Sequence, residues 1–260
     1  MSKPAVALAI PAYNEADGIG EFLLEIDEAL KSSVSALTIV IVDDASSDDT
    51  VDVVTAAAEK MIATVDLVRA SRNRGHGPTL IEAYQRALMA GTDVVLQVDG
   101  DGQFLGADLR RLLVLLEDGA ESVCGVRRFR YDPWVRMVMT RALRTYINAS
   151  FGIPTRDANC PLRGYRSALL AELLPSVPAD SLVPNLYLTI LASKRGSTMV
   201  EVDVSHRVRR GASATGTTWA GPRRTIVPWR LLRFASRALA ESRRFRSSLK
   251  RDEPPGSPAR

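Results

Sequence analysis

The stretch Leu96-Gln97-Val98-Asp99-Gly100-Asp101-Gly102-Gln103 decides how the rest of the chain is interpreted. The apolar run from Asp93 to Val98 predicts a buried strand, which ends in two carboxylates separated by one glycine. Carboxylates at positions i and i+2 beyond a strand end can converge on one divalent cation, and the small glycines leave room for a diphosphate. In open α/β sheets, ligands bind beyond the carboxyl ends of the strands, so the position fits a binding site.

Two simpler interpretations apply to the same stretch. Asp-Gly is ordinary turn chemistry, so the sequence could mark a turn without a bound metal. A calcium-binding loop is a poor match because, with Asp99 as its first position, the sixth would be Phe104 instead of Gly and the twelfth Arg110 instead of Glu.

Length and composition indicate an ordinary globular α/β protein. The 260 residues are 46% apolar and 25% charged, which suits one domain or two small ones with a sizeable core. No run of 18 apolar residues occurs, and the run Ala5–Ile10 is too short for a signal peptide, so we expect a cytoplasmic protein without a membrane span. Cys124 and Cys160 lack metal-site spacing and are expected to be buried thiols in a reducing compartment.

Charge is distributed unevenly along the chain. Residues 206–260 contain 14 Lys and Arg against three acidic residues, which makes this part +11 and leaves the preceding residues at −7. This asymmetry is typical of an acidic catalytic body with a basic tail that binds a polyanion or an anionic membrane surface. The tail has no recognisable nucleic-acid-binding module, so we expect no nucleic-acid partner.

Strand and helix patterns alternate through the first half. Strands are expected at 5–10, 37–42, 65–68 and 93–98, and helices at 16–31, at 50–60 and in the segment that ends at Leu88. Ser47 or Asp48 is a candidate cap for the second helix, and Pro78 fits the first turn of the third. The alternation predicts a mostly parallel, doubly wound sheet with polar residues after each strand. Phosphate-binding glycine loops are absent, so a metal on Asp99 and Asp101 is the expected phosphate anchor.

Four polar motifs occur at intervals of about 30 residues. They are Pro11-Ala12-Tyr13-Asn14-Glu15, Val42-Asp43-Asp44-Ala45-Ser46-Ser47-Asp48, Asn73-Arg74-Gly75-His76-Gly77 and Asp99-Gly100-Asp101-Gly102-Gln103. In this order, over residues 5–215, the chain resembles family 2 glycosyltransferases of the GT-A fold. Within them it looks most like the dolichol-phosphate mannosyltransferase-like, or polyprenyl-phosphate glycosyltransferase, branch.

The resemblance implies a donor site for a nucleoside diphosphate sugar. Residues that would line the nucleotide pocket are Pro11, Tyr13, Glu15 and Asn73, and either Asp43 or Asp44 would bind the base or ribose. Asp99, Asp101 and Gln103 would hold Mg²⁺ or Mn²⁺ against the diphosphate, and Asp101 is also assigned a catalytic role. Transfer in this family inverts the anomeric carbon.

The resemblance also implies an acceptor site in the second half. Arg127 ends a fifth expected strand, 122–127, and corresponds to an arginine that contacts phosphates. Arg136 and Thr140 lie four apart on an expected helix, 134–149, and share a face where the family binds the acceptor phosphate. Here Thr140 replaces the usual Ser.

Asp157 begins the segment 157–166, which resembles a family motif with Asp followed by Arg-x-Tyr-Arg. It is a candidate general base, or alternatively a residue that only orients Arg163. A hydroxyl acceptor needs a base, whereas a phosphomonoester, with a second pKa of about 6, does not. Residues 206–213, with Arg207 and Arg209, resemble a loop that closes over the donor pyrophosphate.

We therefore expect a GT-A domain at 1–222, with a nucleotide-sugar half at 1–105 and an acceptor half at 106–222. A basic amphipathic helix at 225–250 either packs on the body or lies on anionic lipid at the inner face of the cell membrane, and residues 251–260 have the composition of a disordered end. The expected reaction is transfer of one sugar to a polyprenyl phosphate. The alternatives are a hydroxyl acceptor, such as a small saccharide or metabolite, and a non-catalytic nucleotide-sugar-binding protein.

Overall fold

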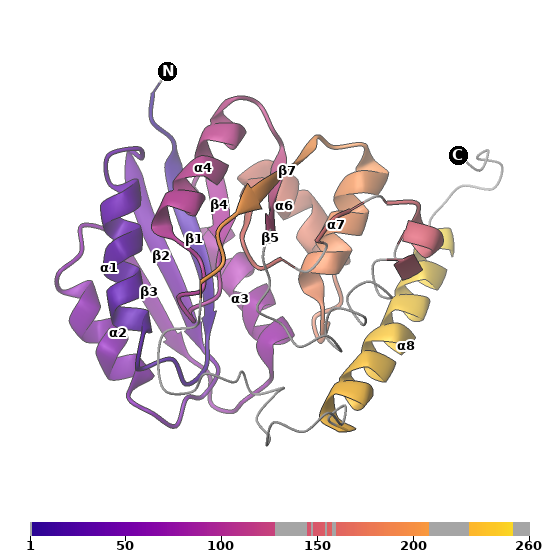
Figure 1. Ribbon diagram of the computed structural model, residues 1–260, viewed down its shortest axis with the longest axis horizontal. Helices are drawn as coiled ribbons and strands as arrows, with labels where there is room; N and C mark the ends of the chain where they lie inside the picture. The colour runs from indigo at the N-terminus through magenta and orange to yellow at the C-terminus, as the bar shows by residue number, and fades with distance from the viewer. Residues whose placement is uncertain are drawn as a thin grey trace.

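A computed structural model of the chain describes residues 2–127, 145–146, 148–153, 155–157, 160–207 and 229–251 (Figure 1). The strands are β1 Ala5–Ala12, β2 Ala36–Asp43, β3 Thr64–Arg69, β4 Val94–Gln97, β5 Ser122–Arg127, β6 Arg163–Arg166 and β7 Met199–Val204. The helices are α1 Ile19–Leu30, α2 Thr50–Ala58, α3 His76–Met89, α4 Gly106–Glu117, α6 Ser167–Leu173, α7 Pro184–Arg195 and α8 Trp229–Arg251, with a 3₁₀ turn, η1 Leu174–Ser176.

One seven-stranded sheet runs through both halves of the chain in the order β3-β2-β1-β4-β6-β5-β7. All neighbouring strands are parallel except β6, which is antiparallel to both β4 and β5. The mostly parallel, doubly wound α/β sheet predicted from the sequence is therefore confirmed. The reversed strand β6 was not predicted, because Arg163-Gly164-Tyr165-Arg166 is too short and too polar to show an alternating pattern.

Helices cover both faces of the sheet, and the side chains of β1 show how the faces differ. Val6, Leu8 and Ile10 pack into a cluster with residues of α1, α2 and α4. Ala7 and Ala9 face a second cluster formed with α3, α6 and α7. Because successive side chains of a strand point to opposite faces, the uninterrupted apolar run of β1 is buried on both sides.

The predicted elements of the first half are present with shifted ends. β1 continues through Ala12, and α1 begins only at Ile19 because the N–H groups of Gly18 and Ile19 donate to Glu15 O in a turn. The N-cap position of α2 is occupied by Asp49, without a side-chain cap hydrogen bond, so the prediction of Ser47 or Asp48 as the cap is wrong by one or two residues. Asp48 still accepts from the N–H of Thr50 at 3.1 Å, at the first residue of the helix. Pro78 lies in the first turn of α3, as predicted. Helices α4, α6 and α7 had not been assigned from the sequence.

Gly77 is the point where α3 approaches the loop before α7. A Cβ at this position would lie 1.8 Å from Ser181 O and 3.2 Å from Leu182 Cα. Only a residue without a side chain fits so close to another backbone, so Gly77 sets the distance between these two segments.

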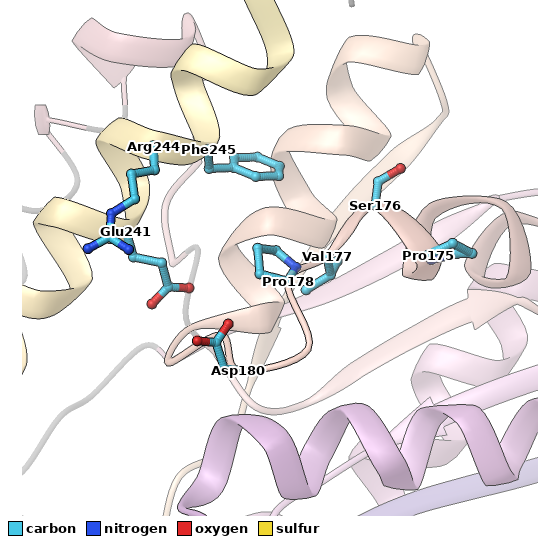
Figure 2. A pocket seen from close by; sticks show the side chains of 8 residues that line it. All are labelled: Pro175, Ser176, Val177, Pro178, Asp180, Glu241, Arg244 and Phe245. Carbon is cyan, nitrogen blue, oxygen red and sulfur yellow. The ribbon is translucent and has the colours of Figure 1, made fainter.

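The predicted tail helix is present as α8, on the opposite side of the molecule from α1 and α2 (Figure 1). It packs on α7, where the rings of Phe245 and Tyr187 lie 4.2 Å apart, and Glu241 accepts from the N–H of Leu182 at 3.2 Å. Figure 2 shows the Phe245 ring reaching toward the segment that carries Val177 and Pro178. Of the two interpretations of the tail, packing on the body describes this part of the helix.

Three further expectations concern particular segments. Within the described part of the chain, no helix is both long enough and apolar enough to cross a bilayer. Cys124 and Cys160 are buried free thiols, as expected. Of the helix expected at 134–149, residues 145–146 and 148–149 are helical, and residues 128–144 and 147 lie outside the described part, as do residues 252–260.

Candidate active site

The polar motifs meet at one edge of the sheet. β1, β2, β3 and β4 are parallel neighbours, so the loops that follow them leave the sheet side by side. The register places Ala12 opposite Asp43, and Asp43 opposite Arg69. This is the edge at which ligands bind in open α/β sheets.

The loops after β1 and β2 are joined by hydrogen bonds. The N–H of Asn14 donates to Ser46 Oγ at 2.9 Å, and the N–H of Ser47 donates to Asn14 Oδ1 at 2.9 Å. The N–H of Glu15 donates to Thr50 Oγ1 at 2.9 Å. These bonds hold Asn14, whose φ of 53° is in the left-handed region. The loop pair is thus ordered by the protein's own contacts.

The residues expected in the nucleoside pocket occupy different depths at this edge. Pro11 is buried in β1 opposite Val42, whereas Tyr13 and Glu15 are half-buried. Asn73 is exposed in the loop before α3. The four residues are thus brought to the same end of the sheet, and their contact with a nucleotide stays a prediction.

Asp43 and Asp44 both bind to the protein itself. Asp43 is fully buried, accepts from the N–H of Ser46 at 3.0 Å and from the Ser46 hydroxyl, and lies 3.8 Å from Arg69 Nε. Asp44 accepts from the N–H groups of Arg74 and Gly75, each at 2.8 Å. These contacts make the pair a support for the loops before α2 and α3; a role at the base or ribose stays a prediction.

Asp99 and Asp101 follow β4 at the centre of this edge, and both are half-buried. Asp99 Oδ1 accepts from Gln97 Nε2 at 3.2 Å and lies 3.9 Å from His76 Nε2. Asp101 Oδ1 accepts from the N–H of Gln103 at 3.1 Å. Directly after Asp101, Gly102 has a φ of 67°, a conformation that bends the loop and favours glycine.

The donor set at Asp99 and Asp101 suits magnesium or manganese. Within the described residues no three His, Cys, Asp or Glu side chains form a ready cluster for a metal. Mg²⁺ does not need one, because it is usually held by one or two carboxylates together with water and substrate phosphate oxygens. Two half-buried carboxylates beyond a strand end fit that pattern.

Arg127 and Asp157 form a buried ion pair at the same edge. Arg127 Nε donates to Asp157 Oδ2 at 2.8 Å, and Nη2 donates to Oδ1 at 3.0 Å. The side chains are only 11% and 5% exposed. Asp157 reaches this edge because β6 is antiparallel, so the segment before it begins where β4 and β5 end. The sequence predicts Asp157 as a general base or as a residue that orients Arg163; the hydrogen bonds described above join Asp157 to Arg127.

Arg163 is 1% exposed and is held inside the protein. It donates to Cys160 O at 2.9 Å, to Thr189 Oγ1 at 2.7 Å and to the hydroxyl of Tyr165 at 3.3 Å. A ligand-binding role for Arg163 is expected from the sequence; the contacts described here connect β6 to α7.

The two cysteines near Arg163 are chemically quiet. Burial raises the pKa of the Cys124 thiol, and raises that of Cys160 to about 12, so both stay protonated at neutral pH.

Arg207 joins the end of β7 to the Asp99–Gln103 loop. Its side chain donates to Gly102 O at 2.5 Å and to Glu25 Oε2 at 2.8 Å, and its N–H donates to Gln103 O at 2.9 Å. The predicted contact of Arg207 with the pyrophosphate is untested, and the observed contacts fix the loop. Arg136, Thr140 and Arg209 lie outside the described residues.

Several residues near the site were missed by the sequence analysis. Glu25 of α1 binds Arg207 and accepts from the N–H of Gly106 at 2.9 Å. Tyr84 and Asn185 are connected to Asp99 by hydrogen bonds: Tyr84 donates to Asn185, Asn185 donates to Gln97, and Gln97 donates to Asp99. Glu25 and Tyr84 look like ordinary members of amphipathic helices, so no local sequence signal separates them from other helix residues.

Comparisons with known proteins agree with this architecture. Residues 7–174 match the family model described as Glycosyl transferase family 2. The undecaprenyl-phosphate 4-deoxy-4-formamido-L-arabinose transferase of Serratia proteamaculans (strain 568) is 30% identical over 204 residues, which are 78% of this chain and 60% of that protein. The transferase of the same name from Shewanella sediminis (strain HAW-EB3) is 27% identical over 81% of this chain and 62% of its own length. The chain thus spans about three fifths of these relatives.

Solved structures share the fold at lower identity. Glucosyl-3-phosphoglycerate synthase from Mycobacterium tuberculosis, crystallised with Mn²⁺, UDP-glucose and phosphoglyceric acid, has a TM-score of 0.67 at 18% identity over 94% of this chain and 80% of its own. A mannosyltransferase from Pyrobaculum calidifontis in complex with GDP-Man and Mn²⁺ has a TM-score of 0.60 at 21% identity over 94% and 65%. The fold is the GT-A fold, and on the match over residues 7–174 the chain belongs to glycosyl transferase family 2.

Proposed function

We propose that this chain transfers a single sugar from a nucleoside diphosphate sugar to a polyprenyl phosphate, with a divalent cation and with inversion at the anomeric carbon. The main support for the proposed donor site is the position of Asp99 and Asp101. Both follow β4, a central strand that lies between β1 on one side and β6 and β5 on the other. Family membership supports the same donor class.

On the donor side, Asp99 and Asp101, with Gln103, would hold Mg²⁺ or Mn²⁺. A divalent cation held there would neutralise the charge that develops on the departing nucleoside diphosphate. The protein's own contribution is an ordered edge: the loops after β1 and β2 are hydrogen bonded to each other, and Arg207 fixes the backbone of Gly102 and Gln103. Little reorganisation is then needed when the donor binds.

A lipid phosphate as acceptor is supported by the names of the relatives from Serratia and Shewanella, which are undecaprenyl-phosphate transferases. A phosphomonoester, with a second pKa of about 6, is already ionised at neutral pH and attacks the anomeric carbon without losing a proton. The bond from that carbon to the diphosphate breaks as the new bond to the phosphate oxygen forms.

The alternative with a hydroxyl acceptor needs a general base, and Asp157 is the candidate. Both oxygens of Asp157 accept hydrogen bonds from Arg127, which favours a structural carboxylate and hence the phosphate acceptor. Because removing either partner disturbs the same buried pair, Asp157→Asn has to be compared with Arg127→Gln. With a phosphate acceptor we expect Arg127→Gln, which also loses the expected phosphate contact, to lose at least as much kcat as Asp157→Asn, and the double variant to be no worse than Arg127→Gln. A base role would make Asp157→Asn worse than Arg127→Gln by about 10²–10⁴-fold.

We also propose that α8 brings the protein to an anionic membrane surface at the inner face of the cell membrane. On its apolar side, Phe245 is buried against Tyr187 of the body, whereas five arginines of the helix are exposed. These are Arg233, Arg237, Arg243, Arg244 and Arg246. Binding would therefore depend on charge, at about 1 kcal/mol for each basic residue near the surface.

Sedimentation with vesicles tests the membrane proposal. The full chain is expected to bind vesicles rich in anionic lipid and to be released by salt, and not to bind neutral vesicles. The double variant Arg237→Glu/Arg244→Glu keeps Phe245 and the packed side of α8, and is expected to lose binding. Equal binding by this variant and by the unchanged chain would overturn the membrane proposal.

Thermal shift is the first test of the transferase proposal. The protein would be melted with UDP, GDP, TDP or CDP, each with and without Mn²⁺, beside the variant Asp101→Ala. At a ligand concentration of about 100 Kd, binding adds about 2.7 kcal/mol to the free energy of unfolding. We expect a metal-dependent shift with one diphosphate that the variant lacks. No shift with any diphosphate would overturn the proposal, and a shift without turnover on polyprenyl phosphates or hydroxyl acceptors would favour the non-catalytic binding protein.

A further inference from the structure

A chain of three buried side chains leads from the protein interior to Asp99. Tyr84 of α3 donates its hydroxyl to Asn185 Oδ1 at 2.9 Å, Asn185 Nδ2 donates to Gln97 Oε1 at 3.2 Å, and Gln97 Nε2 donates to Asp99 Oδ1 at 3.2 Å. Tyr84 and Gln97 are fully buried and Asn185 is 3% exposed. Three elements, α3, α7 and β4, therefore meet in one hydrogen-bonded path that ends at a candidate metal ligand.

The direction of donation along this chain is fixed by chemistry. Burial raises the pKa of Tyr84 well above its ordinary value, so its hydroxyl keeps the proton and donates it. Once the carbonyl of Asn185 accepts from Tyr84, its amide NH₂ faces Gln97, and the NH₂ of Gln97 must then face Asp99. An ionised carboxylate only accepts, so the chain has a consistent end at Asp99. Aligned hydrogen bonds of this kind polarise and strengthen one another.

The chain is also held from its sides. Thr189 Oγ1 donates to Asn185 O at 2.9 Å and accepts from Arg163 at 2.7 Å. The ring of Tyr84 packs edge-on against Tyr165 at a centroid distance of 6.0 Å. These contacts fix the backbone of α7 at Asn185 and the ring of Tyr84, so the two elements that carry the chain are held next to Gln97.

We propose that Gln97 and Asn185 are positioning residues that orient the Asp99 carboxylate and thereby set the affinity of the site for a divalent cation. The inference rests on the proposed function, because it takes Asp99 as a ligand of the cation that accompanies the donor diphosphate. Partners that orient metal ligands typically contribute about 10- to 100-fold to metal affinity.

The test measures Mn²⁺ binding directly, by the electron paramagnetic resonance signal of free Mn²⁺ in titrations with UDP, GDP, TDP or CDP present. Gln97→Met keeps the length of the side chain but removes the donor to Asp99, and is expected to weaken Mn²⁺ binding about 10- to 100-fold. Tyr84→Phe keeps the ring and frees the Asn185 amide to turn over, so it is expected to weaken binding in the same direction by a smaller factor. Asn185→Leu is expected to weaken Mn²⁺ binding by about as much as Gln97→Met.

Leu188→Ala is the matched control, because Leu188 is a fully buried residue of the same helix α7 without a place in the chain. It is expected to lower the melting temperature and leave the Mn²⁺ affinity unchanged. If the unchanged protein and Asp101→Ala bind Mn²⁺ equally, the proposed function fails. If the unchanged protein binds specifically but Gln97→Met and Tyr84→Phe bind equally well, only the positioning role is overturned. Equal weakening in Leu188→Ala would also overturn it, since general destabilisation would then explain the effect.

Discussion

At the scale of residues, the acidic side chains at the edge of the sheet divide into two kinds. Asp43 and Asp44 are at most 2% exposed, and each accepts backbone hydrogen bonds that shape a neighbouring loop. Asp99 and Asp101 are half-buried and follow the end of β4. Asp101 also accepts one backbone N–H, from Gln103, but Asp99 and Asp101 both stay partly exposed, and a partly exposed pair of carboxylates can still take a cation.

Gly77 shows how a single residue in a sequence motif serves packing. Its missing side chain lets α3 lie against Ser181, where a Cβ would be 1.8 Å from the carbonyl oxygen. We expect Gly77→Ala to lower the free energy of unfolding by about 3 kcal/mol, at the upper end for overpacking, because both contacting atoms belong to backbones. Urea unfolding followed by circular dichroism measures this value.

Gly91→Ala is the control for Gly77→Ala. Gly91 has a φ of 66°, and a Cβ at this position would have no heavy atom within 4 Å, so only the left-handed backbone penalty applies. This penalty is about 1–2 kcal/mol. A loss at Gly77 no larger than the loss at Gly91 would contradict the close packing of α3 on the loop before α7.

At the scale of elements, the described side chains of α8 contact the body through Phe245, Leu249 and a few polar residues. Phe245 is 5% exposed and packs on Tyr187, and Ser242 lies 3.2 Å from the hydroxyl of Tyr146. The arginines named above for this helix are exposed. Most of the docking energy of the described part should therefore come from Phe245 and its neighbours.

Phe245→Ala tests the docking of α8. We expect it to reduce the free energy of unfolding by about 3 kcal/mol, since the buried ring is lost and a cavity remains against Tyr187. Arg246→Ala, at the next and exposed position of the same helix, should change it by less than about 0.5 kcal/mol. Chemical denaturation of both variants under one set of conditions gives the comparison, and equal values would mean that α8 is not docked through this ring.

At the scale of the whole molecule, buried tyrosines make stability sensitive to high pH. Burial raises the pKa of Tyr84, Tyr165 and Tyr187 above the ordinary value of 10.0. A group whose pKa is raised on folding contributes stability that is fully present below its unfolded pKa and is lost as the pH rises through the folded pKa. Because all three stabilise the folded state only while protonated, ionisation should be coupled to unfolding.

We therefore expect cooperative alkaline unfolding above a pH of about 10, in which tyrosine ionisation and loss of helix occur in one transition. Near-ultraviolet absorbance reports the phenolates, and far-ultraviolet circular dichroism reports the helices. The unfolded chain in concentrated urea serves as the reference and should titrate without a step. Ionisation of all tyrosines near their ordinary pKa with the helices intact would contradict the burial of these side chains.

The sequence by itself determined the architecture of the first half of this chain. Uninterrupted apolar runs such as Ala5–Ile10 predict strands buried on both faces, and polar residues directly after such runs must fall at one edge when the strands are parallel. The alternation of strands and helices, and the place of Asp99 and Asp101 after β4, follow from local patterns of this kind. Local patterns also predicted the tail helix, which appears as α8.

Only the tertiary structure decided which residues of the second half join the edge of the sheet where Asp99 and Asp101 lie. Strand direction is a property of the whole sheet: β6 runs antiparallel between β4 and β5, and this direction carries Asp157 to Arg127, 30 positions away in the chain. The same packing brings Asn185 of α7 within hydrogen-bond distance of Gln97, 88 positions away in the chain. No local pattern encodes these pairings, because hydrogen bonds between distant side chains depend on where whole elements pack, and that is settled by the shared core.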